Sequence, residues 1–436
     1  MGTGQDLYRK ARRLIPGGTQ LLSKRPEMFL PEQWPAYYSR AAGAEVWDLD
    51  GRHYWDMSYM GIGSLILGAA DPDVNAVVQE VVANGSMSTL NAPEEVALAE
   101  LLCELHPWAQ MVRYARSGGE SMALAVRIAR AKTGRDKVAF CGYHGWHDWY
   151  LAANLSTDQA LDGHLLPGLA PRGVPRGLTG TALPFHYNQL DELKAIVAQH
   201  GRELAAIVME PLRDHEPAPG FLEGVRALAD ECGAVWIIDE ITAGFRLCCG
   251  GAHLLYDVKP DMAVFAKGLS NGYPMAAVIG REAVMQAAQD TFISSTYWTD
   301  RIGPAAALAT IRKHRKLRVH EHLIRIGSQV QAGWQEAAAQ SGLAVEAGGM
   351  KPLSHFGFRH EQKQAMRTLY TQLMLDRGFL ASVGFYACFA HTPSQIANYL
   401  QATQDVFSTI RQAVDRNDLS QQLHGPVAHS GFARLT

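Results

Sequence analysis

The sequence lacks several features that mark specialised classes of protein. Its six cysteines form no C-x-x-C pair, which excludes a zinc ribbon and a thioredoxin-type site. No uncharged apolar stretch reaches the roughly 18 residues that a membrane-spanning helix needs. The 40 Lys and Arg residues nearly balance the 43 Asp and Glu residues, so the net charge of −3 gives no bulk attraction to nucleic acid or anionic lipid.

What the chain does contain is an ordinary globular composition, with 47% apolar and 19% charged residues. Its 436 residues exceed a single minimal core, so two or three folding units are expected. The first residues, MGTGQDLYRKARR, contain no apolar signal core, and we therefore expect a cytoplasmic location. We expect no binding to nucleic acid and none to a membrane.

Short apolar runs alternate with helical stretches between about residues 110 and 280. This alternation predicts an α/β fold with a mostly parallel sheet that is covered by helices on both faces. The runs are QMVRYA (110–115), KVAFC (137–141), LAAIVM (204–209), AVWIID (234–239), MAVFA (262–266) and AAVIG (276–280).

The rest of the chain divides around this region. Residues 156–183 are rich in Gly, Pro and Leu and have no clear period, which predicts a long loop or lid. After about residue 304 the pattern is mainly helical, with a few strand-like pieces, which predicts a smaller α+β domain. The predicted organisation is an N-terminal segment at 1–45, a large domain at 46–312 and a small domain at 313–436.

Three polar signals follow predicted strands. RSGGE (116–120) places two glycines at the start of a helix, where exposed N–H groups can hold a phosphate. Asp239 ends a strongly apolar run, where a carboxylate often marks a site at the carboxyl edge of a sheet. Lys267 follows the next run, where low-dielectric surroundings favour a neutral, nucleophilic amine. Taken alone, the three signals also fit a plain strand–helix turn, a structural salt bridge or helix cap, and a solvated loop lysine.

In combination, the three signals match the needs of one cofactor, pyridoxal 5′-phosphate. This cofactor requires an anion cradle, an acid that keeps its ring nitrogen protonated, and a lysine that binds its aldehyde. We therefore predict Asp239 and Lys267 as the catalytic residues. Asp239 enables the ring to accept electrons from the substrate Cα, and Lys267 moves a proton at that carbon.

A series of further motifs gives these signals a context. They are PGG (16–18), DLDGRHYWD (48–56), LILGAADPDV (65–74), SGGE (117–120), YHGWHD (143–148), MEP (209–211), IIDEITAGFR (237–246), AKGLSNGYP (266–274) and AHTP (390–393). In this order, the chain resembles the class-III aminotransferases that depend on pyridoxal phosphate, especially the branch around glutamate-1-semialdehyde aminomutase. The resemblance runs from about residue 14 to the C-terminus and implies fold type I, with a large cofactor-binding domain and a smaller α+β C-terminal domain.

The resemblance also implies further cofactor contacts. Tyr143 matches an aromatic residue that stacks on the cofactor ring, and Ile241 matches the apolar residue on the other face of the ring. Gly119 stands where family members usually carry threonine, so one side-chain contact to the phosphate is absent here. The other implied cofactor-binding residues, besides Asp239 and Lys267, are Ser117, Gly118 and Glu210.

The segment SST (294–296) resembles the family segment that delivers a threonine to the phosphate of the neighbouring subunit. The resemblance therefore implies a homodimer in which Thr296 completes the partner's site. The stretch YWTDRI, which follows Thr296, is longer here than in the aminomutase.

Substrate contacts are predicted from two regions. In the aminomutase, an arginine in the vicinity of SKRPEMF (23–29) holds the substrate carboxylate. Arg25 is preferred here over Lys24 because only an arginine binds a carboxylate in a bidentate manner, and a basic pair on the surface is the alternative. Trp55 and Trp146 are the candidate aromatic walls of the pocket.

His144, His147 and Asp148 have a spacing that metal ligands can adopt. Because they stand beside the predicted cofactor tyrosine, we expect them to support the site or to pack against it. We therefore predict no metal ion.

The predicted function is the transfer of an amino group between a small-molecule amino donor and a keto or aldehyde acceptor by a ping-pong mechanism. The runner-up is glutamate-1-semialdehyde 2,1-aminomutase, which shifts an amino group within one substrate. The aminomutase has a glutamate shortly before its AHT motif, whereas SVGFYACFAHTP (382–393) has no acid and places Tyr386 near that position. A third possibility, an inactive binding protein, is disfavoured because Lys267, Asp239 and Tyr143 are all present.

Overall fold

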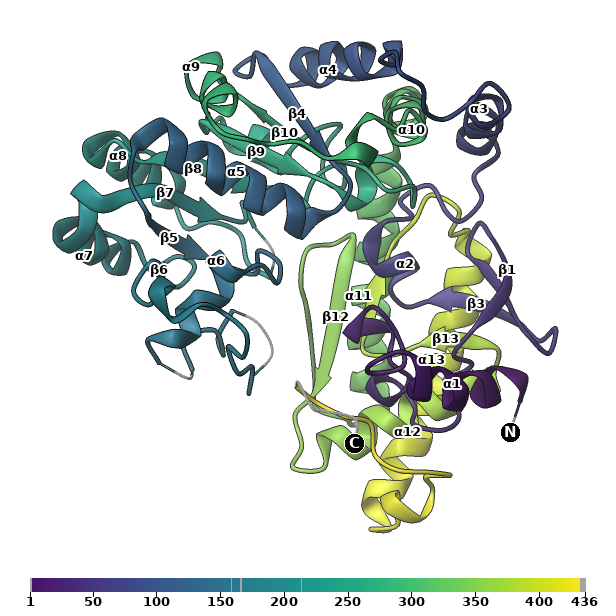
Figure 1. The fold of residues 1–436 in the computed structure, drawn as a ribbon. Coiled ribbons are helices and arrows are strands. Elements are labelled where there is room, and N and C mark those ends of the chain that lie inside the picture. The colour runs from purple at the N-terminus through teal and green to yellow at the C-terminus, as the bar shows by residue number, and fades with distance from the viewer. Residues whose placement is uncertain (1, 158, 165–166, 213, 432–436) are drawn as a thin grey trace. The chain divides into compact units, whose positions relative to one another are not determined.

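The computed structural model describes residues 2–157, 159–164, 167–212 and 214–431 (Figure 1). The chain forms two compact units. Unit 1 consists of Met1–Asp71 and Glu321–Thr436, and unit 2 consists of Pro72–His320. Within the described residues, no helix combines the length and the apolar character needed to cross a membrane.

Strand pairing explains why the two units group the residues differently from the predicted ranges. The sequence predicts residues 46–71 in the large domain, but these residues belong to unit 1. There, β3 (His53–Met57) pairs in parallel with β13 (Phe379–Ala381) near the other end of the chain. Because the two strands are far apart in the sequence, no local sequence pattern predicts that they pair.

Unit 2 is built on a seven-stranded sheet of order β4-β10-β9-β8-β7-β5-β6. Among the strands that the structure describes in this sheet, only β10 runs opposite to the direction of the others, so the predicted mostly parallel sheet is confirmed. All six predicted runs are strands. The seventh strand, β6, was not predicted, because three residues are too few to show an alternating pattern. The strands are β4 (Met111–Ala115), β5 (Lys137–Cys141), β6 (Ala182–Pro184), β7 (Leu204–Met209), β8 (Val235–Asp239), β9 (Met262–Phe265) and β10 (Ala276–Gly280).

Helices cover both faces of this sheet, as the buried side chains show. Residues alternate along a strand between the two faces. Phe140 and Ile237 accordingly pack into one core cluster with α5 (Gly118–Thr133). Their neighbours Ala139 and Ile238 pack into a second cluster with α7 (Leu190–His200) and α8 (Phe221–Cys232). The remaining long helices of unit 2 are α3 (Pro72–Ala83), α4 (Pro93–Leu105) and α10 (Ile302–Leu317).

Unit 1 combines small sheets with long helices, as the sequence predicts for the C-terminal part. Its four-stranded sheet has the order β1-β2-β3-β13, and its three-stranded sheet has the order β11-β12-β14. The buried indole of Trp334 donates to the hydroxyl of Tyr399 at 3.0 Å. The other elements are α1 (Thr3–Leu14), β1 (Tyr38–Ala42), β2 (Glu45–Asp48), α11 (Val319–Ser341), β11 (Val345–Gly348), β12 (Leu353–Phe358), α12 (Lys363–Asp376), β14 (Gly384–Tyr386) and α13 (Pro393–Asp415).

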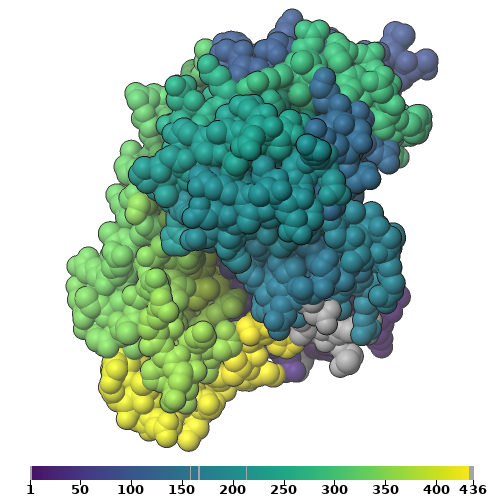
Figure 2. Space-filling model, turned by 90° about the vertical axis from the view of Figure 1, so that its left-hand side faces the viewer, coloured from purple at the N-terminus to yellow at the C-terminus, as the bar shows by residue number. Residues whose placement is uncertain are grey.

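The C-terminal segment, residues 417–431, lies along α12. Figure 2 shows the yellow C-terminal part of the chain next to the yellow-green part of unit 1. The amide of Gln364 donates to the carbonyl of Ala428 at 2.8 Å, and the backbone N–H of His424 donates to Gln372 at 2.8 Å. Since side chains of α12 hold its backbone at several points, the segment is part of the fold of unit 1.

The predicted loop at 156–183 contains a short 3-10 helix at Arg176–Leu178 and ends in β6. Asn154 anchors its first half, because its Oδ1 accepts the Leu161 N–H at 3.0 Å and its Nδ2 donates to the Leu169 carbonyl at 2.7 Å. Residues 158, 165 and 166 of this loop lie outside the described residues. A lid function for the loop stays a prediction.

Because of the buried His391 of the AHTP motif, we expect the folding stability of unit 1 to decrease in acid. Its Nδ1 accepts the Cys388 N–H, and its Nε2–H donates to the Asp56 carbonyl, each at 3.0 Å, so the ring is neutral. Burial lowers the pKa of His391 to about 4 from its ordinary 6.5. The unfolded chain therefore binds a proton first as the pH falls below 6.5. Proton binding to the unfolded chain therefore lowers the free energy of unfolding by about 2 kcal/mol between pH 8 and pH 5.

We test this prediction with His391→Gln, which can accept and donate the same two hydrogen bonds without titrating. Urea unfolding is measured for both proteins at pH 8 and at pH 5. The stability advantage of the wild type over the variant should shrink by about 2 kcal/mol at the lower pH. An equal difference at both pH values would contradict the argument.

Candidate active site

The predicted catalytic residues lie at the carboxyl edge of the unit 2 sheet. Asp239 is the last residue of β8 and pairs with Val264 of the neighbouring strand β9. Lys267 follows the end of β9 by two residues. Because β8 and β9 are parallel, both residues emerge from adjacent strand ends, where parallel sheets place their sites.

Asp239 is buried, and its carboxylate is held on both oxygens. Oδ1 accepts the Ile241 N–H at 2.9 Å, and Oδ2 lies 2.8 Å from Nδ1 of His144. The other ring nitrogen of His144 lies 2.9 Å from the Cys141 carbonyl, which can only accept, so Nε2 carries a proton. The ring of His144 therefore fixes the position of the buried carboxylate.

Lys267 is directed toward the residues that follow Asp239. Its Nζ donates to Oγ1 of Thr242 at 3.0 Å. Its backbone has a φ of +47°, a left-handed conformation that is unusual for a side chain of this size and that tends to occur at functional sites. Thr242 could not be predicted from the sequence, because no local pattern shows that its hydroxyl meets the lysine.

The glycines of the predicted phosphate turn touch two other parts of the site. A Cβ added at Gly118 would lie 3.0 Å from Cδ1 of Ile241, and one added at Gly145 would lie 2.8 Å from the Cα of Gly119. Ser117 caps α5, and Glu120 accepts the Ser117 N–H in return. The start of this helix therefore packs closely against both the Ile241 side chain and the turn after Tyr143.

The turn that carries Tyr143 is fixed by neighbours on both sides. Tyr143 is half-buried and packs on the same core cluster as Ile241. Its N–H points at Oε2 of Glu210 over 3.5 Å, a weak contact. On the other side, Nδ1 of His164 accepts the Gly142 N–H at 3.2 Å, so the predicted lid segment touches this turn. Burial, followed by the charges of His186 and His144, lowers the pKa of His164 to about 4, which keeps this acceptor unprotonated at neutral pH.

The other predicted residues are placed as follows. Trp146 is 70% exposed, stacks on His147 with ring centroids 4.5 Å apart, and lies beside Gly119. Arg25 and Trp55 belong to unit 1. The guanidinium of Arg25 lies against Gly17 of the PGG turn, and the ring of Trp55 packs 5.3 Å from that of Phe379.

Thr296 is exposed at the start of a short 3-10 helix, Thr296–Thr299. The segment is joined to the phosphate turn of its own chain, because the indole of Trp298 donates to Glu120 at 3.0 Å. The hydrogen bond between Trp298 and Glu120 could not be predicted from the sequence, since neither residue is a predicted cofactor contact.

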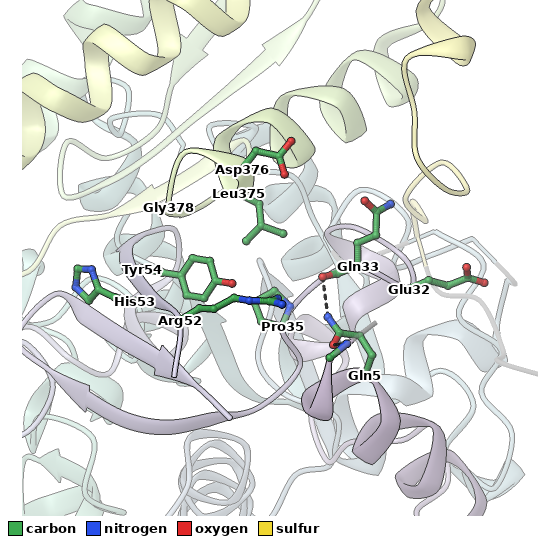
Figure 3. Close-up of a pocket in the computed structure, with 11 residues that line it drawn as sticks. Gln5, Glu32, Gln33, Pro35, Arg52, His53, Tyr54, Leu375, Asp376 and Gly378 are labelled. Carbon is green, nitrogen blue, oxygen red and sulfur yellow. Dashed lines mark hydrogen bonds between the residues drawn. The ribbon is translucent and has the colours of Figure 1, made fainter. Parts of the chain in front are cut away.

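Unit 1 contains a cavity of about 490 Å³ (Figure 3). Arg52 extends across it toward Pro35, and charges of the opposite sign come from Glu32 and Asp376. None of the predicted site residues lines this cavity. It therefore offers neither a lysine for an aldehyde nor a phosphate turn.

The residues at the sheet edge of unit 2 fit pyridoxal phosphate. A lysine amine and a glycine-containing helix start both contact the residues that follow the buried carboxylate of Asp239, at Thr242 and Ile241. An aromatic and an aliphatic side chain pack on the same core cluster. These groups supply an aldehyde ligand, a partner for the ring nitrogen, an anion cradle and two apolar walls.

Comparisons with known proteins point the same way. The sequence pattern of aminotransferase class-III matches residues 31–379. The 3-aminobutyryl-CoA aminotransferase of Cloacimonas acidaminovorans (strain Evry) is 30% identical over 425 residues, covering 94% of this chain and 98% of that protein. The glutamate-1-semialdehyde 2,1-aminomutase of Roseiflexus castenholzii (strain DSM 13941 / HLO8) is 34% identical over 435 residues, covering 94% and 98%.

A comparison with solved structures finds similar folds. The solved structure of the PLP internal aldimine form of the FumI protein from Sphingopyxis sp. MTA144 superposes with a TM-score of 0.86. It is 25% identical, and the match covers 95% of this chain and 98% of that chain.

Proposed function

This chain belongs to the class-III aminotransferases and is a pyridoxal-phosphate-dependent transaminase, and on that premise we propose the roles of its residues. Lys267 binds the cofactor aldehyde and moves the proton at the substrate Cα, and Asp239 holds the proton of the ring nitrogen. The contact of 3.0 Å between Lys267 Nζ and Thr242, three residues after the buried Asp239, carries this proposal. The cofactor supplies the electron sink for the developing charge at Cα.

The remaining site residues bind and orient the cofactor in this proposal. The helix start at Ser117, Gly118 and Gly119 holds the phosphate, because its N–H groups and helix dipole attract an anion. Tyr143 and Ile241 cover the two faces of the ring and exclude water from it. Glu210 supports the turn that presents Tyr143, which is consistent with its contact to the Tyr143 N–H.

We further propose that the enzyme is a homodimer in which Thr296 binds the phosphate held by the partner subunit. The surface around Thr296 supports an interface, because Phe292 is 86% exposed and Tyr297 is 70% exposed. Exposed aromatic side chains are typical of surfaces that another protein covers. Trp146, beside the phosphate turn, adds a further exposed ring.

The substrates are a small-molecule amino donor and a carbonyl acceptor. We propose that three residues bind them. Arg25 is the candidate ligand for a carboxylate, with Trp55 and Trp146 as aromatic walls. We also propose a cytoplasmic location, which agrees with six cysteines that are all free thiols.

Transfer between two molecules predicts a half-reaction. An amino donor added alone should react once per active site, because Lys267 can move the Cα proton before any acceptor arrives. One keto product per Lys267 is expected, together with a change in cofactor absorbance. Rapid-quench analysis of the keto product against a panel of amines and amino acids measures this stoichiometry. A keto acceptor should then restore the original absorbance.

The aminomutase remains the second candidate, since one relative of that name is 34% identical. A mutase must retain its intermediate through both halves of the reaction, for which a gating acid before the AHT motif is useful. Here Tyr386 stands in that region, and its ring packs 5.1 Å from that of Tyr59. Efficient conversion of glutamate-1-semialdehyde to 5-aminolevulinate, with no half-reaction from any donor, would favour the mutase.

A further inference from the structure

A set of side-chain contacts ties the segment that carries Thr296 to the phosphate turn of its own chain. Trp298 donates its indole Nε1–H to Glu120 Oε1 at 3.0 Å. The other oxygen of Glu120 accepts the backbone N–H groups of Arg116 at 2.8 Å and Ser117 at 3.3 Å. Glu120 therefore bridges the tryptophan and the turn. We call Trp298, Glu120 and Arg116 the clasp.

Arg116 closes the clasp through the backbone of the segment. Its Nη2 donates to the carbonyl of Trp298 at 2.9 Å and to that of Asp300 at 2.7 Å. Burial lowers the pKa of the Arg116 guanidinium, and the nearby Asp300, Glu95 and Glu120 carboxylates oppose this shift. A partly buried cation thus holds two carbonyls of the segment in one place, and hydrogen bonds to charged groups are the stronger kind.

The anchored Trp298 follows Thr296 by two residues in the chain. Trp298 packs on the core cluster of unit 2, whereas Thr296 and Tyr297 are exposed. Two residues span at most about 7 Å of backbone. The position of the Thr296 hydroxyl is therefore restricted by an anchor that belongs to the fold.

We propose that Trp298 and Glu120 are positioning residues that present Thr296 to the phosphate site of the partner subunit. This inference rests on the proposed function, in which Thr296 acts in trans. A hydroxyl on a free loop would lose much of its binding contribution, because ordering the loop costs conformational entropy when the phosphate binds. The clasp removes this cost by ordering the segment in advance.

A double-mutant cycle on phosphate affinity tests the inference. The full-length protein, freed of its cofactor and dimeric, is titrated with inorganic phosphate by calorimetry. Thr296→Val should weaken binding about tenfold by removing one hydroxyl, and Trp298→Phe should weaken it about fivefold by releasing the hydroxyl. Because both changes act through the same hydroxyl, the double variant should bind no more weakly than Thr296→Val alone.

Two further variants complete the design. Glu120→Gln weakens the hydrogen bond between Glu120 and the Trp298 indole. This variant replaces Trp298→Phe in the double-mutant cycle if Trp298→Phe lowers the thermal stability of the protein. Arg127→Ala is the matched control, because it removes an exposed hydrogen bond of 3.1 Å from α5 to the Phe292 carbonyl at the other end of the segment. This control should keep the phosphate affinity within about twofold of the wild type.

The outcomes separate the two proposals. An unchanged phosphate affinity in Thr296→Val would overturn the role of Thr296 in trans, and the clasp inference with it. A loss in Thr296→Val without a loss in Trp298→Phe would overturn the clasp alone. Additive losses in the double variant would do the same, because Trp298 would then act on the phosphate turn of its own chain.

Discussion

Replacing Lys267 with alanine is expected to lower kcat/KM by at least about ten-thousandfold, because one change removes both the cofactor's covalent ligand and the proton carrier. The structure gives this lysine a hydrogen bond to Thr242 of 3.0 Å, next to the buried acid. Steady-state kinetics with an excess of added cofactor measures the loss. The excess separates weak cofactor binding from loss of chemistry.

Lys259→Ala serves as the control for this prediction, because Lys259 is an exposed lysine of the same unit. It should retain wild-type activity. A small primary amine added to Lys267→Ala should restore part of the rate, since it can carry the missing proton. Substantial activity of Lys267→Ala without added amine would contradict the assigned role.

Asp239→Asn is expected to lower kcat roughly a hundred- to a thousandfold while leaving the fold intact. The amide has the shape of the carboxylate but cannot hold a proton on the ring nitrogen by charge. The substitution also removes the carboxylate oxygen Oδ2 that lies 2.8 Å from Nδ1 of His144. Measurement of kcat, together with the pH dependence of cofactor absorbance, tests both effects.

Glu240 offers a matched control in the next position of the chain. It is also buried and is 2.7 Å from Nδ1 of His253. Consecutive residues at a strand end point to opposite faces, so Glu240 faces a different cluster from Asp239. Glu240→Gln should lower stability yet leave the pH dependence of cofactor absorbance unchanged. Similar absorbance changes in both variants would show that charge at Asp239 has no special role.

Much of unit 2 follows from the sequence. Apolar runs of strand length that alternate with helices specify a parallel sheet, and a parallel sheet brings the carboxyl ends of its strands to one edge. Asp239 and Lys267 could therefore be placed together before any contact was known. The same reasoning placed Gly118 at that edge, whereas Tyr143 was predicted from the resemblance to the family.

The remaining features depend on contacts that no local pattern records. The pairing of β3 with β13 joins distant segments, so the limits of the two units could not be read from composition. The roles inferred for Thr242 and Trp298 depend on their side-chain hydrogen bonds, which join Thr242 to Lys267 and Trp298 to Glu120. His144 was expected to support the site, but its contact with Asp239 depends on how the turn after β5 folds back.

The most direct test of the account is to find the lysine that binds the cofactor. The purified enzyme is reduced with borohydride, which fixes the cofactor to its lysine, and is then digested and analysed by mass spectrometry. The account predicts one modified peptide, which contains Lys267, and no adduct in the Lys267→Ala variant. An adduct on any other lysine would contradict the assignment of the active site to this edge of the sheet.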